Sequence, residues 1–193
     1  MLNMLRLPID IDIAGLQHDV DRLTDDDWIP HFNTRDYEGD WSAASLRAIG
    51  GDARRIYPDP SRTDYSDTDL RRRCPATSKL LEAMDCRFLA VRFMRLGPGS
   101  RILEHRDLRL SYEDEELRLH IPISSGPDVR FTVDGTVVPL KPGECWYLNL
   151  TRMHAVTNRT DRPRVHLVAD CEVDDRMRQW MCEAIAIEQM VGT

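Results

Sequence analysis

The sequence predicts a mainly β domain of the jelly-roll or barrel type, and two features indicate this. Apolar and polar residues alternate over residues 117–123 and again over residues 164–170, which is the period of a strand with one aliphatic face. Strand-like segments follow one another closely and are separated by glycine and proline turns, at residues 97–99 and at Pro142-Gly143. Closely spaced strands with such turns are typical of jelly rolls and barrels.

Further strands are expected on both sides of these segments. They are predicted at residues 87–96, 102–110 and 145–150, with a hairpin at residues 131–140. Asp134-Gly135 lies between β-branched residues in that hairpin and is the signal of a type I′ turn. By contrast, the polar residues 54–73 are expected to form a long surface loop, and such loops often contribute substrate contacts.

Helices are expected to flank the β region at both ends of the chain. Residues 12–23 have apolar residues at helical spacing, and Thr77 or Ser78 can cap a short helix that runs through Leu80. A last helix is predicted over residues 174–190, and we expect it to buttress the sheet. Its predicted apolar face consists of Met177, Trp180, Met181, Ala184 and Ile185.

The length of 193 residues suits one domain. We expect residues 1–85 to supply N-terminal helices and loops that pack on the core. Residues 86–172 should form the β core itself, and residues 173–193 the C-terminal helix.

The composition indicates which kinds of partner and which cellular compartment to expect. The net charge of -7 argues against nucleic acid or an anionic membrane as the main partner. Five cysteines form an odd set without a CxxC pair, as expected for free thiols in a reducing cytoplasm. No secretion signal and no membrane span are expected, and a cytoplasmic location follows. A homodimer is the default for a soluble enzyme.

The residues His105-Arg106-Asp107 and the later His154 form the candidate catalytic metal site. On a strand, the first and third residues of His-x-Asp share one face, because side chains alternate with a period of two. Two imidazoles and one carboxylate on one face of an octahedron leave three positions open, as in non-haem Fe(II) oxygenases. A zinc hydrolase could use the same ligand set, but no positioned general base is evident.

Two of the predicted strands each carry an arginine and a histidine on their polar face. Arg118 and His120 share one such face, and Arg164 and His166 share the other. A solvated surface would explain either pair alone. The repetition beside a candidate metal triad favours a polar lining inside a barrel instead.

An ordered series of these motifs resembles the aspartyl/asparaginyl β-hydroxylase family. The series consists of Pro98-Gly99, His105-Arg106-Asp107, residues 118–122, Asp134-Gly135, residues 142–146, His154, Asn158 and residues 164–170. It covers the central third of the chain strongly, and Trp41 extends it weakly toward the N-terminus. The resemblance implies a cupin-like double-stranded β-helix that uses Fe(II), 2-oxoglutarate and O2 and includes hydroxylases of free amino acids.

The resemblance also implies roles for the polar residues of the barrel lining. Arg164, ten residues after His154, matches the family's arginine for the distal carboxylate of 2-oxoglutarate, which a planar guanidinium binds through two hydrogen bonds. Arg118 and His120 are implied as further contacts of this co-substrate, with His166 behind them. A structural ion pair with one of the many carboxylates is the alternative for either arginine.

The substrate expected from the resemblance is a small amino acid or a derivative of one. The family's protein-modifying animal enzymes lack the carboxylate ligand, whereas this chain keeps Asp107. Arg92 matches an arginine of the amino-acid hydroxylases, and Arg95 should point to the opposite face; Trp41 is a second candidate contact. A peptide or carrier-bound substrate and a non-catalytic cupin-like binding domain remain alternatives. His18 and His31 lie outside the pattern and are expected to be ordinary polar residues.

Overall fold

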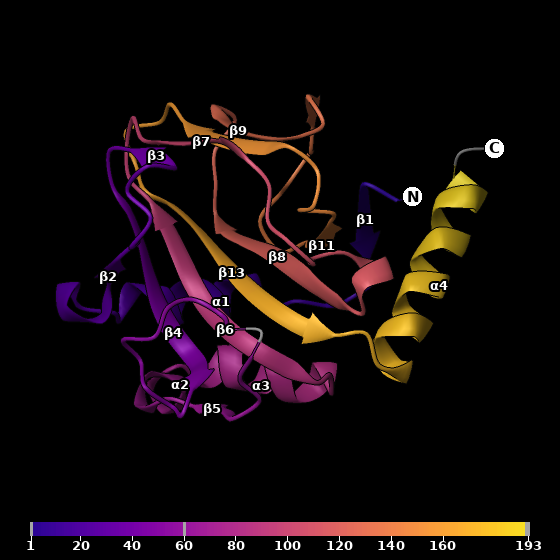
Figure 1. The fold of residues 1–193 in the computed structure, drawn as a ribbon, viewed down its shortest axis with the longest axis horizontal. Coiled ribbons are helices and arrows are strands. Elements are labelled where there is room, and N and C mark those ends of the chain that lie inside the picture. The colour runs from indigo at the N-terminus through magenta and orange to yellow at the C-terminus, as the bar shows by residue number, and fades with distance from the viewer. Residues whose placement is uncertain (1, 60, 192–193) are drawn as a thin grey trace.

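The computed structural model describes residues 2–59 and 61–191, and within them the chain forms two β-sheets that face each other (Figure 1). The eight-stranded sheet consists, in spatial order, of β1 (Met4–Leu7), β11 (Cys145–Leu148), β8 (Glu116–Ser124), β13 (Arg164–Glu172), β6 (Phe88–Leu96), β4 (Trp41–Ile49) and β2 (Ile29–Pro30), with β5 (Tyr65–Asp67) paired to β4. The five-stranded sheet consists of β10 (Thr136–Val137), β9 (Val129–Val133), β12 (His154–Asn158), β7 (Arg101–His105) and β3 (Tyr37–Glu38). The predicted mainly β jelly roll is confirmed.

The central strand of the larger sheet is β13, which pairs antiparallel with both β8 and β6. Val168 lies opposite His120 on one side and opposite Arg92 on the other, and Asp170 lies opposite Arg118. Residues in register across a sheet share a face. Arg92, His120 and Val168 therefore point toward the smaller sheet, whereas the odd-numbered Leu119 and Leu167 point away from it.

Each face of the larger sheet has its own hydrophobic cluster. The outer cluster contains fully buried aliphatic residues of β8 and β13, among them Leu117, Leu119, Ile121 and Leu167, and it is continued by residues of the helices. The inner cluster lies between the sheets and includes Trp41, Met94, Ile102, Phe131 and Val156. The inner space is thus shared between apolar packing and polar side chains.

Helices cover the outer face and one edge of the larger sheet (Figure 1). They are α1 (Ile13–Asp21), α2 (Asp69–Arg73), α3 (Pro75–Met84) and α4 (Asp175–Val191), with 3-10 turns at Asp25–Asp27 and Tyr112–Asp114. The side chain of Asp12 accepts a hydrogen bond from the Gly15 amide at 3.0 Å, and Asp174 accepts one from the Met177 amide at 2.8 Å. These caps explain where the first and last helices begin. No helix of the described residues is long and apolar enough to cross a membrane.

The predicted hairpin at residues 131–140 is confirmed as β9 and β10. Its turn residues, Asp134 and Gly135, have φ of 47° and 73°, as a type I′ turn requires. The Met177, Trp180, Met181 and Ala184 side chains of α4 are buried as expected, but Ile185 is 39% exposed and lies off that face. The strand predicted at residues 102–110 is shorter than expected, because β7 ends at His105 and residues 106–110 lie outside it.

Three other expectations about the first 85 residues are wrong. This part of the chain supplies strands as well as helices, since β4 pairs with β6 and β1 pairs with β11. The segment 54–73 is not wholly loop, because it contains β5 and α2. Neither Thr77 nor Ser78 caps α3, which starts at Pro75; Thr77 instead donates hydrogen bonds from its amide and hydroxyl to the buried Asp19 carboxylate, at 2.7 and 2.8 Å.

Candidate active site

Three side chains that can bind a metal meet where β7 ends and β12 begins. His105 is the last residue of β7, and the register places it opposite His154, the first residue of β12. Asp107 lies just beyond the strand, where its amide donates to the Leu150 carbonyl at 2.9 Å. One ligand atom of each of the three residues lies within 4.8 Å of the others. The His-x-Asp pair and the distant histidine are therefore brought together, although Asp107 itself is not in a strand.

Backbone hydrogen bonds fix the orientation of both imidazoles. Nδ1 of His105 lies 2.8 Å from the Leu103 carbonyl oxygen, and Nδ1 of His154 lies 3.0 Å from the Arg152 carbonyl oxygen. Since a carbonyl only accepts, each Nδ1 carries the hydrogen, and each Nε2 keeps its lone pair. Burial lowers the pKa of His154 to about 4, which favours the neutral ring. Neutral imidazoles with a free Nε2 are the form that binds a metal.

A chain of charged groups connects Asp107 to the centre of the larger sheet. Arg118 donates from Nη1 to Asp107 at 2.8 Å, and from Nε and Nη2 to Asp170 at 2.5 and 3.1 Å. Arg92 donates from Nη2 to the same Asp170 carboxylate at 3.1 Å. Asp170 is fully buried, and although burial opposes its ionisation, the charges of Arg118 and Arg92 leave its pKa lowered. The register explains this group, because Asp170 lies opposite Arg118 and diagonal to Arg92.

Among the described residues, the buried cation Arg164 has no carboxylate partner. Its side chain is 3% exposed, Nη2 donates to Nδ1 of His166 at 2.7 Å, and Nε has no partner. Burial lowers the pKa of Arg164 to about 9. His120 is 5% exposed, and neither of its ring nitrogens has a hydrogen-bond partner in the described part of the chain. Burial lowers its pKa well below the usual value. A buried guanidinium without a counterion costs free energy, so this position is suited to an anionic ligand.

These groups line one cavity of about 390 Å³ between the two sheets. All three candidate metal ligands line it, together with Arg92, Arg118, His120, Arg164, Trp41, His31 and Phe131. Its apolar lining includes Met94, Ile102, Leu110, Leu150 and Val156. The cavity thus combines a few charged groups with an apolar wall, the usual composition of a small-molecule site.

The remaining predicted residues divide between the cavity and its surroundings. Arg92 faces the cavity, whereas Arg95 lies on the opposite face, where it bonds to Ser42 at 3.1 Å and lies over the Trp28 ring. The expectation of opposite faces is therefore confirmed. His166 does not line the cavity and instead supports Arg164 from behind.

His31 and Phe131 are among the aromatic residues of the cavity that sequence reasoning missed. His31, which was expected to be an ordinary polar residue, stacks on Trp41 with ring centroids 3.6 Å apart and lines the cavity; His18 is exposed on α1. Phe131 lies parallel to the His154 ring, at 6.3 Å between centroids. The inward alternation of β9 could have indicated Phe131, but no local pattern marks His31, which precedes β3 in an irregular segment.

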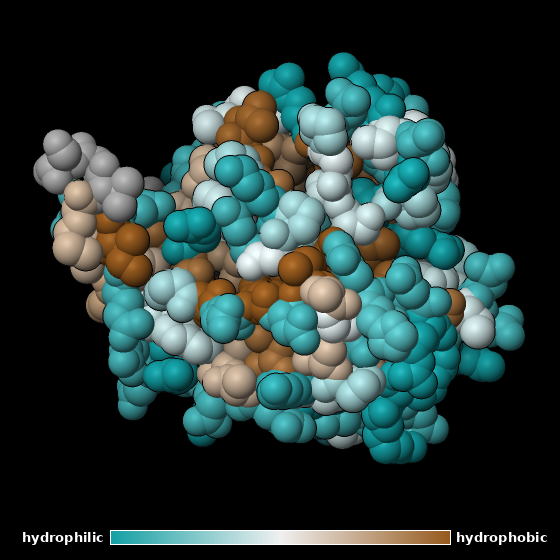
Figure 2. Space-filling view, turned by 180° about the vertical axis from the view of Figure 1, so that it is seen from behind, coloured by the Kyte–Doolittle hydropathy of each residue, from teal (hydrophilic) through white to brown (hydrophobic). Residues whose placement is uncertain are grey.

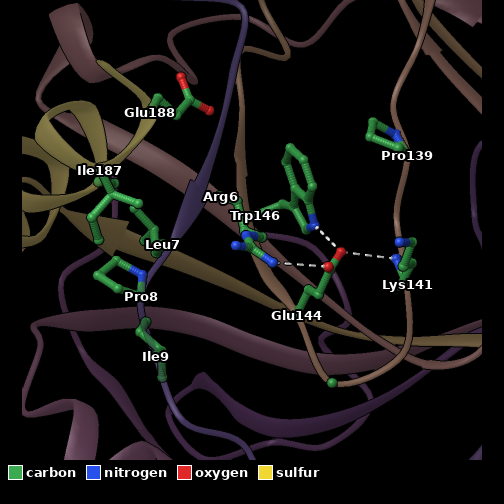
Figure 3. A pocket seen from close by; sticks show the side chains of 12 residues that line it. Arg6, Leu7, Pro8, Ile9, Pro139, Lys141, Glu144, Trp146, Ile187 and Glu188 are labelled. Atoms are coloured by element: carbon green, nitrogen blue, oxygen red, sulfur yellow. Dashed lines mark hydrogen bonds and ion pairs between the residues drawn. The ribbon is translucent and has the colours of Figure 1, made fainter. Parts of the chain in front are cut away.

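A larger hollow of about 740 Å³ lies elsewhere, between β1, α4 and the start of β11. Seen from behind, the molecule has hydrophobic side chains gathered across the middle of one face (Figure 2). In the hollow, Glu144 accepts hydrogen bonds from Arg6 at 3.2 Å, from the Trp146 indole at 2.9 Å and from the Lys141 amide at 3.2 Å (Figure 3). The Glu144 carboxylate is satisfied by these neighbours. Among the described residues, the group of side chains that could hold a metal lies in the cavity between the sheets and not in this hollow.

Known proteins resemble the chain in sequence and in fold. It is 25% identical over 140 residues to L-proline cis-3-hydroxylase 1 of a Streptomyces species, which covers 70% of this chain and 48% of that protein. The chain therefore spans about half the length of this curated relative.

Two solved structures share its fold at low sequence identity. An oxidoreductase of the 2OG-Fe(II) oxygenase family from Burkholderia pseudomallei matches with a TM-score of 0.58 at 13% identity, over 90% of this chain and 86% of the other. A Pseudomonas putida prolyl-4-hydroxylase matches with a TM-score of 0.53 at 14% identity, over 88% and 92% of the two chains.

The family model of the aspartyl/asparaginyl beta-hydroxylases matches residues 12–173, which include both sheets from β2 to β13 and every residue of the candidate site. The structure adds the jelly-roll fold and places His105, Asp107 and His154 together. The chain belongs to the aspartyl/asparaginyl β-hydroxylase family.

Proposed function

We propose that this protein is an Fe(II)- and 2-oxoglutarate-dependent dioxygenase that hydroxylates an unactivated C–H bond of a small amino acid or amino-acid derivative. The observation that carries the proposal is that one cavity contains both a set of three candidate metal-ligand atoms within 4.8 Å and the buried cation Arg164, which has no carboxylate partner among the described residues. A metal set alone would also fit a hydrolase. The arginine adds a position for a dicarboxylate co-substrate.

The donor set fits Fe(II). His105 and His154 each present a free Nε2 lone pair, and Asp107 adds one carboxylate, so the protein supplies three ligands and leaves positions open for co-substrate and O2. When bound, the iron together with 2-oxoglutarate and O2 supplies the oxidising power, with release of succinate and CO2. The protein's own part is to hold these ligands and to exclude water from them.

Arg164 would hold the distal carboxylate of 2-oxoglutarate. Its buried Nε has no partner, and His166 fixes the guanidinium from the other side through a 2.7 Å hydrogen bond to Nη2. His120, beside it in the cavity, would contribute a neutral ring nitrogen as a further contact. An anion here would neutralise a charge that is otherwise buried at a cost, which favours binding.

The family resemblance implies that Arg118 contacts 2-oxoglutarate, but its surroundings favour another role. Its guanidinium already bonds to the Asp107 and Asp170 carboxylates. We propose that Arg118 orients Asp107 for the metal, with any contact to the co-substrate coming second. Ligand carboxylates are commonly fixed by such outer hydrogen bonds.

Arg92 and Trp41 would contact the substrate. Both line the cavity, and Arg92 is 3% exposed with Nε and Nη1 lacking partners. An amino-acid carboxylate would satisfy them. The curated relative is named as a hydroxylase of L-proline, which supports a small amino-acid substrate, while a peptide or carrier-bound residue is the alternative.

The test is mass spectrometry of the purified protein with Fe(II), 2-oxoglutarate, ascorbate and O2, against pools of free amino acids and their derivatives. We expect succinate and a substrate that has gained one oxygen, in equal amounts. Protein loaded with Zn(II) is the control and should form neither. Succinate without a hydroxylated product would point to a peptide or tethered substrate. No succinate and no binding of 2-oxoglutarate would contradict the proposal.

A further inference from the structure

Three large apolar side chains are exposed to solvent and at the same time line the cavity. Phe32 is 61% exposed, Tyr57 is 47% exposed and Leu108 is 80% exposed. A residue that both lines a cavity and is open to solvent lies at its mouth. We call these three residues the apolar collar.

The collar is built from three separate segments of the chain. Phe32 precedes β3, Tyr57 lies between β4 and β5, and Leu108 follows the ligand Asp107. Single exposed apolar residues are ordinary on a protein surface, but several around one opening commonly mark a ligand or partner site. The collar therefore belongs functionally to the cavity that it surrounds.

An aromatic path leads from the collar into the cavity. The Tyr57 and Phe32 rings lie 4.9 Å apart, the Phe32 and His31 rings 4.8 Å, and the His31 and Trp41 rings 3.6 Å. Trp41 at its inner end is 7% exposed. Burial lowers the pKa of His31 to about 4, so its ring is neutral and adds no charge to this path. The path is an uncharged surface suited to an apolar group.

The inner end of the cavity has the opposite chemistry. Arg92 has two unpartnered nitrogens there, although Asp170 pairs with its third. The volume of about 390 Å³ is near the lower end of the range of ligand pockets, roughly 300–1,000 Å³. If 2-oxoglutarate occupies part of it, only a small portion of the substrate fits inside.

We propose that the substrate is an amphipathic carboxylate, whose carboxylate is bound by Arg92 and whose apolar portion extends along the aromatic path to the collar. This inference rests on the proposed function and names its substrate class: an amino acid with a long apolar side chain or an apolar acyl group, in place of a compact polar amino acid.

Two series of probes test this, because the apolar chain can be attached at either end of an amino acid. One series runs from L-alanine to L-2-aminodecanoic acid, and the other from N-acetylglycine to N-decanoylglycine. Their dissociation constants are measured by calorimetry on protein loaded with Mn(II) and 2-oxoglutarate. In at least one series the affinity should rise about four-fold for each methylene that reaches the collar, which corresponds to ~0.8 kcal/mol.

Substitutions of the collar show whether it is the cause. Leu108→Ser should flatten the rise for long probes and leave the affinity for the shortest probe unchanged. Because Leu108 is 80% exposed, this substitution should not impair folding. Phe32→Ser should act in the same way. Val137→Ser is the matched control, because Val137 is 47% exposed but does not line the cavity.

Each outcome decides one question. Affinity that does not depend on chain length in either series, or collar variants that weaken short and long probes equally, would overturn the inference, as would the absence of binding by every probe. Binding of 2-oxoglutarate is measured first on the same protein. If it binds and the probes then fail, the proposed oxygenase stands without this substrate class; if it does not bind, both proposals fall.

Discussion

The two faces of the larger sheet come from the same strands and have opposite characters. On β8 and β13, the odd-numbered residues Leu119 and Leu167 are fully buried in an aliphatic cluster that continues into the helices. The even-numbered residues His120 and Arg164 are almost as buried, yet both have polar atoms without a partner. The side chains of the two faces are therefore buried to a similar degree. They differ in that polar atoms on the inner face lack hydrogen-bond partners.

This difference separates residues that stabilise the fold from residues that we propose to bind ligands. Burying aliphatic side chains lowers the free energy of the folded state, by about 25 cal/mol per Å² of apolar surface. A buried polar group without a partner raises it, by roughly 1–3 kcal/mol. The inner face thus raises the free energy of the folded state, and a bound anion or metal would reduce this increase. The aliphatic packing of the outer face offsets it.

The largest expected effect is on the three candidate metal ligands, which β7, β12 and the segment after β7 hold opposite the inner face of the larger sheet. His105→Ala, Asp107→Ala and His154→Ala should each abolish turnover with little change in the unfolding midpoint, because these side chains face a cavity. Activity and thermal unfolding are measured together. Arg106→Ala, at the exposed position between two of the ligands, is the control and should keep activity. Wild-type turnover in any ligand variant would remove that residue from the triad.

Asp170→Ala should lower the free energy of unfolding, because Asp170 stabilises the fold although it lies on the inner face. It leaves Arg92 and Arg118 without their shared counterion, and removing one partner of a buried pair costs about 3–5 kcal/mol. Urea unfolding measures this. Glu172 lies on the same strand as Asp170 and forms an exposed ion pair with Arg87, so Glu172→Ala should cost roughly 0–1 kcal/mol. Equal losses in the two variants would mean that the buried pairs contribute no more than the exposed one.

Leu119→Ala tests the outer face. Since Leu119 is fully buried in the aliphatic cluster, its truncation should lower the free energy of unfolding by about 2–5 kcal/mol. The affinity for 2-oxoglutarate at a temperature where the variant is folded should stay unchanged. Leu108→Ala, at an exposed leucine, should alter stability by less than about 0.5 kcal/mol. A large loss of co-substrate affinity in Leu119→Ala would show that the two faces are coupled.

The smallest effect on stability is expected for Arg164→Ala. It should raise the 2-oxoglutarate requirement, because each lost charge-assisted hydrogen bond is worth roughly 1.5–3 kcal/mol. It should not lower stability, since the variant also removes an unpaired buried cation. Arg164→Lys should restore affinity only partly, because an ammonium lacks the planar fork. Calorimetry with 2-oxoglutarate measures both, with exposed Arg162→Ala as control; an unchanged affinity in Arg164→Ala would transfer the role to Arg118.

Local periodicity predicted much of this architecture correctly. Alternation over residues 117–123 and 164–170 assigned Arg118, His120, Arg164 and His166 to one face, and β8 and β13 have that arrangement. It also separated Arg92 from Arg95, which do lie on opposite faces. These predictions succeed because successive side chains of a strand point to opposite faces, whichever strands lie beside it.

Contacts between distant segments could not be predicted in the same way. Asp107 reaches the histidines from a position beyond β7, held by the Leu150 carbonyl, and not from the same strand face as His105. Arg118 pairs with Asp107 and Asp170, and His31 enters the cavity by stacking on Trp41. None of these partners is marked by spacing along the chain.

The sequence by itself determined the strands β6, β8, β11 and β13, the polar and aliphatic faces of β8 and β13, and the hairpin turn, because these depend on neighbouring residues. It also offered His105, Asp107 and His154 as candidate metal ligands. Only the tertiary structure decided which polar groups satisfy one another and which remain open to a ligand. That outcome depends on register between strands far apart in the chain, where a shift of one residue would turn Asp170 away from Arg118.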